Sequence, residues 1–176
     1  MAINAMQAAA VAIARARGDT RFVLGRAPTV DVEDVRRHAG TSTGIEIVEG
    51  RTHEVMRAAD LLLVTSGTAA LEAALLGTPM VVCYRVSRLT ELVVRRLIRI
   101  PWISLANIAL GRTAVPELIG IAVTGERLAA EALQLLGDPG ALAAQRAAFC
   151  ELTGMLGERG VGERAARLVL AAAAGA

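Results

Sequence analysis

The chain has 176 residues, of which 54% are apolar, 20% are charged and 2% are aromatic, and its formal net charge is +2. This apolar fraction excludes a disordered chain, and the two cysteines exclude a disulfide scaffold and suit a reducing cytosol. No apolar run is long enough to span a membrane, and arginines follow the apolar N-terminal stretch, which is the wrong order for a secretory signal. With so few aromatic side chains, we expect no nucleic-acid binding by base stacking.

Short apolar runs alternate with helical stretches along the first part of the chain. The pattern predicts helices at 3–17, 31–39, 52–59, 66–76 and 89–99. It predicts strands at 21–24, 45–48, 61–64, 80–84 and 100–105. After Gly120 it predicts only helices, at about 125–136, 140–156 and 162–173. Such alternation is typical of an α/β fold with a parallel sheet, in which a ligand binds at the carboxyl ends of the strands.

The pattern places a helix before the first predicted strand. In doubly wound domains the first strand lies centrally, at the point where the strand order reverses. A sheet without that strand would consist of two halves that lack their shared neighbour, with unpaired backbone groups between them. We therefore expect this chain to be a fragment of a larger fold.

A turn of small residues, Ser66–Ala69, follows the third predicted strand and opens the next helix. Gly67 allows close backbone approach, and the free N–H groups and the dipole of a helix start favour an anion such as a diphosphate. The hydroxyls of Ser66 and Thr68 could add hydrogen bonds, and Glu72 could accept the two hydroxyls of a ribose. The alternative is an ordinary helix cap at Ser66 or Thr68 with Glu72 solvated, and the spacing leaves both interpretations open.

The segment 59–73, with the sequence ADLLLVTSGTAALEA, resembles the signature of lipid-A-disaccharide synthase. Further similar segments follow in the same order and spacing at 77–87, 104–108, 111–112 and 115–119. The resemblance implies a glycosyltransferase of the GT-B type, with two Rossmann-like domains. It also implies the inverting transfer of a 2,3-diacylglucosaminyl group from UDP-2,3-diacylglucosamine to 2,3-diacylglucosamine 1-phosphate, which forms lipid A disaccharide and UDP.

The resemblance covers the C-terminal, UDP-binding half of that family, without the N-terminal domain or the Gly-Ser-Arg loop that opens the C-terminal domain. Residues 1–122 would form a Rossmann-like UDP-sugar-binding domain with a parallel sheet of about five strands, lacking its first strand. Residues 123–176 would form a C-terminal helical segment. The nucleotide-binding residues implied by the resemblance are Ser66, Gly67, Thr68, Ala69, Glu72, Tyr84, Arg85, Asn107 and Glu117.

The catalytic residues and the lipid acceptor site are expected in the absent N-terminal domain. The resemblance implies no cofactor and no metal, because a helix dipole and arginines can stabilise the leaving diphosphate. Two positions depart from the family pattern: Ala106 stands where proline is usual, and Gly120 stands where glutamine is usual.

A basic segment lies between residues 85 and 112, with six arginines and one glutamate. In a helix at 89–99 the apolar residues would share one face, with the arginines outside it, namely Arg88, Arg95, Arg96 and Arg99. Such a face could bind an anionic membrane surface, or it could simply be a solvated face over the core. The first alternative predicts a cytoplasmic protein, peripheral on the cytoplasmic face of the inner membrane. A homodimer is left open.

Two other functions remain open at this stage: another UDP-sugar glycosyltransferase of the same architecture, and an inactive nucleotide-binding or membrane-surface fragment. His38 and His53 lack partners at metal-ligand spacing, so we expect them at the surface. Cys83 falls in a predicted buried strand, and we expect it to be a small core residue.

Overall fold

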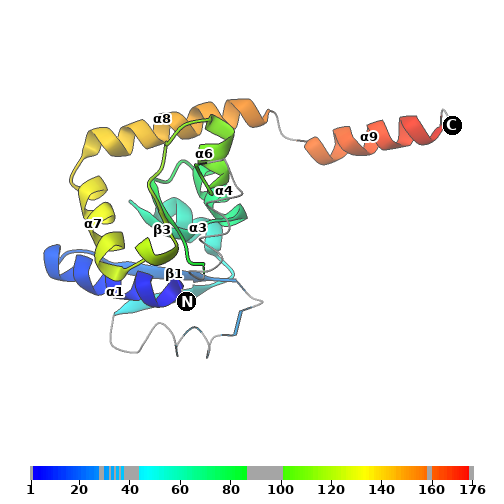
Figure 1. Cartoon of the computed structure of the whole chain (residues 1–176). Helices are drawn as coiled ribbons and strands as arrows, with labels where there is room; N and C mark the ends of the chain where they lie inside the picture. The colour runs from blue at the N-terminus through cyan, green and yellow to red at the C-terminus, as the bar shows by residue number, and fades with distance from the viewer. Residues whose placement is uncertain are drawn as a thin grey trace.

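The computed structural model describes residues 2–27, 44–86, 101–157 and 160–174, together with residues 30, 31, 33, 35 and 37 (Figure 1). The strands in these ranges are β1 (Phe22–Arg26), β2 (Ile45–Glu49), β3 (Leu62–Thr65), β4 (Met80–Tyr84) and β5 (Glu117–Ile119). The α-helices are α1 (Ala2–Ala16), α3 (Thr52–Ala58), α4 (Thr68–Leu75), α6 (Leu105–Leu110), α7 (Gly125–Leu136), α8 (Pro139–Leu156) and α9 (Val161–Ala174). A short 3₁₀ turn at Gly120–Ala122 follows β5.

The strand pairs are parallel, which confirms the predicted α/β class, and they form two separate sheets. In one sheet β1 pairs with β2, with Phe22 opposite Ile45. In the other sheet β4 lies between β3 and β5, so that Val82 is opposite both Val64 and Glu117. Over the described ranges, no ladder joins β1 to β3. The five strands therefore do not make the single sheet that the sequence pattern suggested.

The last strand is not at 100–105, where the pattern placed it. Residues 101–104 lead into α6 without forming a strand, and β5 takes the edge position beside β4. Pro101 has no N–H to give to a ladder, and Ser104 caps α6 by accepting a hydrogen bond from the N–H of Asn107 at 3.2 Å. The apolar composition of this segment therefore serves packing rather than strand pairing.

Two further predicted elements need comment. The helices predicted at 31–39 and 89–99 lie largely or wholly outside the described residues, although the carboxylate of Asp31 accepts a hydrogen bond from the N–H of Glu33 at 2.8 Å. Helix α3 is capped by Arg51 without a side-chain hydrogen bond. The helices predicted after Gly120 are confirmed as α7, α8 and α9.

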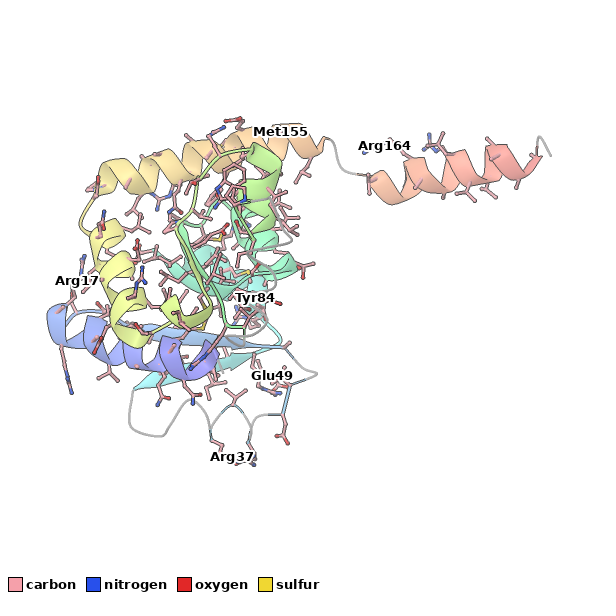
Figure 2. The ribbon with its side chains drawn as sticks, in the orientation of Figure 1. Arg17, Arg37, Glu49, Tyr84, Met155 and Arg164 are labelled. Atoms are coloured by element: carbon pink, nitrogen blue, oxygen red, sulfur yellow. The ribbon has the colours of Figure 1, made fainter. Side chains whose placement is uncertain are left out.

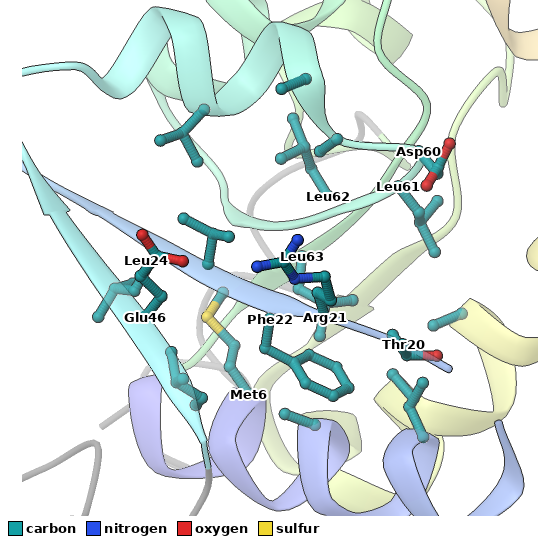
Figure 3. Close-up of a pocket in the computed structure, with 18 of the residues that line it drawn as sticks. Met6, Thr20, Arg21, Phe22, Leu24, Glu46, Asp60, Leu61, Leu62 and Leu63 are labelled. Carbon is teal, nitrogen blue, oxygen red and sulfur yellow. The ribbon is translucent and has the colours of Figure 1, made fainter. Parts of the chain in front are cut away.

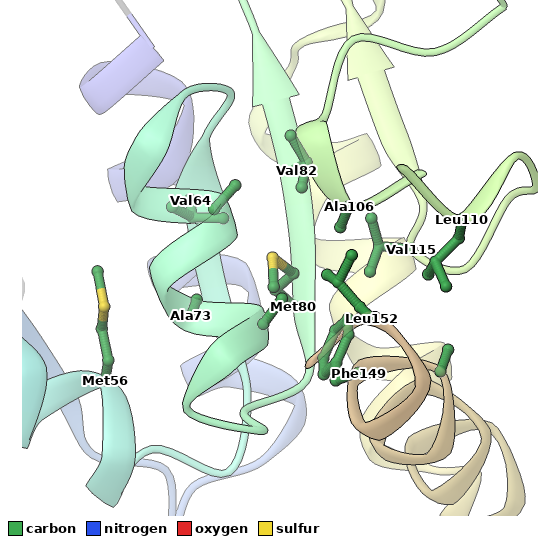
Figure 4. Close-up of a cluster of buried hydrophobic side chains, with 13 residues drawn as sticks. Met56, Val64, Ala73, Met80, Val82, Ala106, Leu110, Val115, Phe149 and Leu152 are labelled. Carbon is green, nitrogen blue, oxygen red and sulfur yellow. The ribbon is translucent and has the colours of Figure 1, made fainter. Parts of the chain in front are cut away.

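Strand β4 is the centre of two hydrophobic cores, one on each face of its sheet. Met80 and Val82 belong to the core covered by α4, α6 and α8, whereas Val81 and Cys83 belong to the core covered by α1 and α7 (Figure 4). All four side chains have no exposed surface, as expected for a parallel strand covered by helices on both faces. The continuous apolar sequence of β4 is explained by this position.

The C-terminal helices differ in how they are attached. The buried side chain of Gln145 on α8 accepts a hydrogen bond from the N–H of Met80 at 2.9 Å and donates one to its carbonyl at 3.3 Å. Helix α7 packs against α1, where Gly125 faces the backbone of Ala8. Helix α9 has no buried residue and extends away from the rest of the fold (Figure 1). The domain division between 122 and 123 stays a prediction.

Candidate functional site

The turn at Ser66–Ala69 joins the end of β3 to the start of α4, which confirms the predicted strand–turn–helix. Gly67 has a φ of +144°, a conformation that residues with a Cβ rarely adopt. A Cβ built at Gly67 would meet nothing within 4 Å, so the backbone conformation, and not a lack of space, requires glycine here. Gly67 is also the N-cap of α4, with no side-chain hydrogen bond. The alternative of a Ser66 or Thr68 cap is therefore wrong, and the first N–H groups of α4 are left for an anion.

The Ser66 hydroxyl has a partner within the protein. Its Oγ donates a hydrogen bond to the carbonyl of Ile103 at 2.8 Å, and the side chain is half-buried. Gly67 and Thr68 are exposed beside it, and Ala69 is half-buried. The hydroxyl thus fixes the segment before α6 onto the turn, and its contact with a ligand stays a prediction.

Asn107 and Glu117 form one hydrogen-bonded unit under this segment. The side-chain oxygen of Asn107 accepts from the N–H groups of Ala114 and Val115 at 2.7 and 2.9 Å, and its nitrogen donates to the carbonyl of Val115 at 2.9 Å and to Glu117 at 2.7 Å. The Glu117 carboxylate also accepts from the N–H groups of Ile103 and Ser104 at 2.8 and 3.0 Å. These two side chains position the loop, and direct ligand contact from them stays a prediction.

Glu72 lies on α4 with 46% of its side chain exposed, and its partner is His53. The Nε2 atom of His53 is 3.0 Å from a carboxylate oxygen of Glu72. His53 stands at the start of α3, just after β2 ends, so Glu72 is directed to the side of the fold where the strands end. The sequence analysis left His53 without a partner, because only the packing of α3 beside α4 brings these two side chains together.

Tyr84 and Arg85 lie at the carboxyl end of β4, and both are exposed (Figure 2). The N–H of Ser66 donates to the carbonyl of Cys83 at 3.0 Å, so the turn and the end of β4 are adjacent. The structure therefore brings together the turn, Glu72, Tyr84 and Arg85 at one edge of the sheet.

The basic segment is only partly described. Arg88, Arg95, Arg96 and Arg99 lie outside the described residues. Arg112 forms two hydrogen bonds with the carboxylate of Glu151, at 2.9 and 2.5 Å, and this contact raises the pKa of Arg112 and lowers that of Glu151. Its charge is therefore already compensated on the surface.

Two searches of the described ranges gave no site. The helices there include none with the length and apolar character needed to cross a membrane. The same part of the chain contains no group of three His, Cys, Asp or Glu side chains placed to hold a metal ion.

Comparisons with known proteins agree on the family. The lipid-A-disaccharide synthetase family model matches residues 6–171. A lipid-A-disaccharide synthase of Anaeromyxobacter dehalogenans is 43% identical over 167 residues, which is 94% of this chain and 44% of that protein. The same enzyme of Alkalilimnicola ehrlichii is 46% identical over 136 residues, which is 77% of this chain and 35% of that protein. This chain thus spans less than half the length of these relatives.

A solved structure supports the fold. A crystal structure from Listeria monocytogenes, assigned as a UDP-N-acetylglucosamine 2-epimerase, aligns with a TM-score of 0.56 and 20% identity. The alignment covers 82% of this chain and 35% of that one. By the extent of the family match and the identity to its members, the chain belongs to the lipid-A-disaccharide synthetase family.

Proposed function

We propose that this chain is the donor-nucleotide half of a lipid-A-disaccharide synthase and binds the UDP group of UDP-2,3-diacylglucosamine. In the complete reaction, a hydroxyl oxygen of 2,3-diacylglucosamine 1-phosphate bonds to the anomeric carbon of the donor as the bond to the UDP phosphate oxygen breaks, with inversion. The hydroxyl proton goes to a base, and UDP leaves. The base and the acceptor site belong to the part of the family's length that this chain does not span.

The observation that carries the proposal is the uncapped start of α4 at the end of β3. A diphosphate fits there because its charge would be met by the N–H groups of the first helical turn and by the positive end of the helix dipole. Glu72, about one turn into the helix, would accept hydrogen bonds from the ribose hydroxyls. His53 would then act as a positioning residue for that carboxylate.

The remaining groups at this edge complete the proposed site. Tyr84 and Arg85 follow the neighbouring strand, where the cation would face the phosphates and the ring would border the nucleotide. Asn107 and Glu117 would hold Ile103 and the turn in place without touching UDP. Leaving-group charge would be stabilised by the helix start and by arginine, so the proposed chemistry uses no metal.

Calorimetric titration of the purified chain with UDP tests the proposal. We expect measurable but weak binding, because one half of a two-domain site is present, and a loss of at least tenfold in Glu72→Ala. The matched control is Glu163→Gln, an exposed carboxylate on α9. Equal affinity of the Glu72→Ala variant and the parent would contradict the ribose assignment. A folded chain that binds no UDP would favour the inactive-fragment alternative.

The proposal includes peripheral attachment to the cytoplasmic face of the inner membrane, since donor and acceptor both carry acyl chains. Support comes from the sequence alone, namely Arg88, Arg95, Arg96 and Arg99. Each arginine near an anionic surface contributes about 1 kcal/mol, which salt screens over roughly 8 Å. Vesicle co-sedimentation should show salt-sensitive binding to anionic but not neutral lipid, and the fourfold glutamine variant should lose it. Equal binding by both proteins would leave a solvated face as the explanation.

A further inference from the structure

A cavity of about 730 Å³ separates the two sheets, and none of the proposed nucleotide-binding residues lines it (Figure 3). Its two sides are strands: residues 20–24 on the β1 side and residues 61–63 on the β3 side. Above and below it are apolar side chains of α1 and α3, including Met6, Ile13 and Val55. The cavity is therefore a slot between two strand edges, closed by a helix on each face.

The backbone on both sides of the slot lacks ladder partners. β1 pairs only with β2, and β3 pairs only with β4, within the ranges that the structure describes. The edge of each strand that faces the slot presents N–H and C=O groups, which a natural sheet pairs or covers. Charge or proline, which protect free edges, are absent from Leu61–Val64.

The side chains of these strands show the same incompleteness. Val81 and Val82 of β4 have no exposed surface, whereas Leu61, Leu62 and Leu63 are only half-buried and Val23 of β1 is 46% exposed. The sequence of β3 is as apolar as that of β4, and such continuous apolar strands belong in the interior of a parallel sheet. β3 therefore has the sequence of an interior strand in an edge position.

We propose that this slot binds an extended, apolar β-strand contributed by the part of the lipid-A-disaccharide synthase length that this chain does not span. A strand that lies between β1 and β3 would join the two sheets into one. Its backbone would pair with both free edges, as the described ladders pair in parallel, and its side chains would be buried against α1 on one face and α3 on the other. Chain for this purpose exists in the family, because the relatives are matched over only 44% of their length.

The chemistry of the slot favours a strand over other occupants. An acyl chain would fill the apolar volume but would leave the edge N–H and C=O groups buried without partners, at a cost of a few kcal/mol each. A strand satisfies both requirements. From the four to five residues of β3 and β1, the occupant should be about five residues long, apolar on both faces and without proline.

The test uses this full chain and, as the probe, the part of the Anaeromyxobacter dehalogenans lipid-A-disaccharide synthase outside the matched region, added as a separate tagged polypeptide. We expect the two to co-purify, and amide hydrogen exchange in segments 22–26 and 62–65 to slow at least tenfold in the complex. Exchange in β4 and α9 should not change. Absence of binding, or binding that protects neither segment, would overturn the proposal.

Two variants and two competing occupants sharpen the test. Leu63→Glu places a charge in the slot and should weaken binding at least tenfold, whereas Val169→Glu, at an exposed position on α9, should not. The parent chain's own exchange, measured at two concentrations, reports a second copy as occupant if protection rises with concentration, which would overturn the proposal. Laurate that protects both segments and displaces the probe would overturn it in favour of an acyl site. UDP titration is separate from all of these results, so this inference can fail while the proposed function stands.

Discussion

The side-chain nitrogen of Asn107 donates a hydrogen bond to the Glu117 carboxylate across 2.7 Å, and this contact connects α6 to β5. Asn107 is fully buried and has all of its side-chain donors and acceptors engaged. Through the N–H groups of Ile103 and Ser104, Glu117 extends the unit to the residues that the Ser66 hydroxyl holds. The turn at the proposed nucleotide site is thus supported from below by two side chains.

Replacing this amide should be costly. Asn107→Ala leaves the N–H groups of Ala114 and Val115 without their acceptor, and buried unsatisfied groups cost about 1–3 kcal/mol each. We expect a loss of about 3 kcal/mol in the free energy of unfolding, measured by urea denaturation. Asn4→Ala, at an exposed position of α1, is the control and should stay within about 0.5 kcal/mol of the parent.

Alanine at two glycines should act in opposite directions. Gly67→Ala forces a Cβ into a backbone conformation with φ of +144°, so we expect a loss of about 1–3 kcal/mol although the surrounding space is open. Gly154→Ala lies within α8, where a Cβ also meets nothing within 4 Å, and should gain up to about 1 kcal/mol. Thermal unfolding of both variants measures the difference. Two shifts of the same sign would contradict the strain at Gly67.

The two cysteines should differ in reactivity. Burial raises the pKa of the Cys83 thiol from 9.0 to about 11, whereas Cys150 is exposed. Ellman's reagent at pH 8 should therefore titrate one thiol in the folded chain and two in urea, because the thiolate is the reactive form. Rapid reaction of both thiols in the folded chain would show that the sheet opens easily at β4.

The same burial predicts a pH dependence of stability. Between pH 9 and about 11 the unfolded chain loses the Cys83 proton while the folded chain keeps it, so the free energy of unfolding falls as the pH rises. Urea denaturation from pH 8 to 10.5 should show this decline, and Cys83→Ala should show less of it. An equal decline in both proteins would assign the effect to other groups.

Gln145 should be more important than an ordinary helical glutamine. Gln145→Ala removes both hydrogen bonds to Met80 at the buried start of β4, and we expect a loss of about 2 kcal/mol or more. Gln134→Ala on α7, where the side chain is exposed, serves as the comparison. Equal urea midpoints for the two variants would mean that the Gln145 contact contributes nothing.

The sequence could predict those elements whose own residues decide their structure. Continuous apolar runs indicated β3 and β4, and the small residues around Gly67 indicated the turn between β3 and α4. The strand predicted at 100–105 failed because its N–H groups at Ile103 and Ser104 bind a carboxylate 14 and 13 residues away, which no local pattern records. His53 was missed for a similar reason, since its contact with Glu72 depends on the packing of two helices.

The hydrogen bonds between Gln145 and Met80 have a consequence for the order of folding during synthesis. β1 and β2 contact each other over a short stretch of chain, from Phe22 to Ile45, and can close early. The core around Met80 and Val82 is completed by Phe149 and Leu152, so one face of β4 cannot be covered until the ribosome has released residues beyond 152. Long-range closure of this kind slows folding, and it leaves an apolar strand open to chaperones for most of translation.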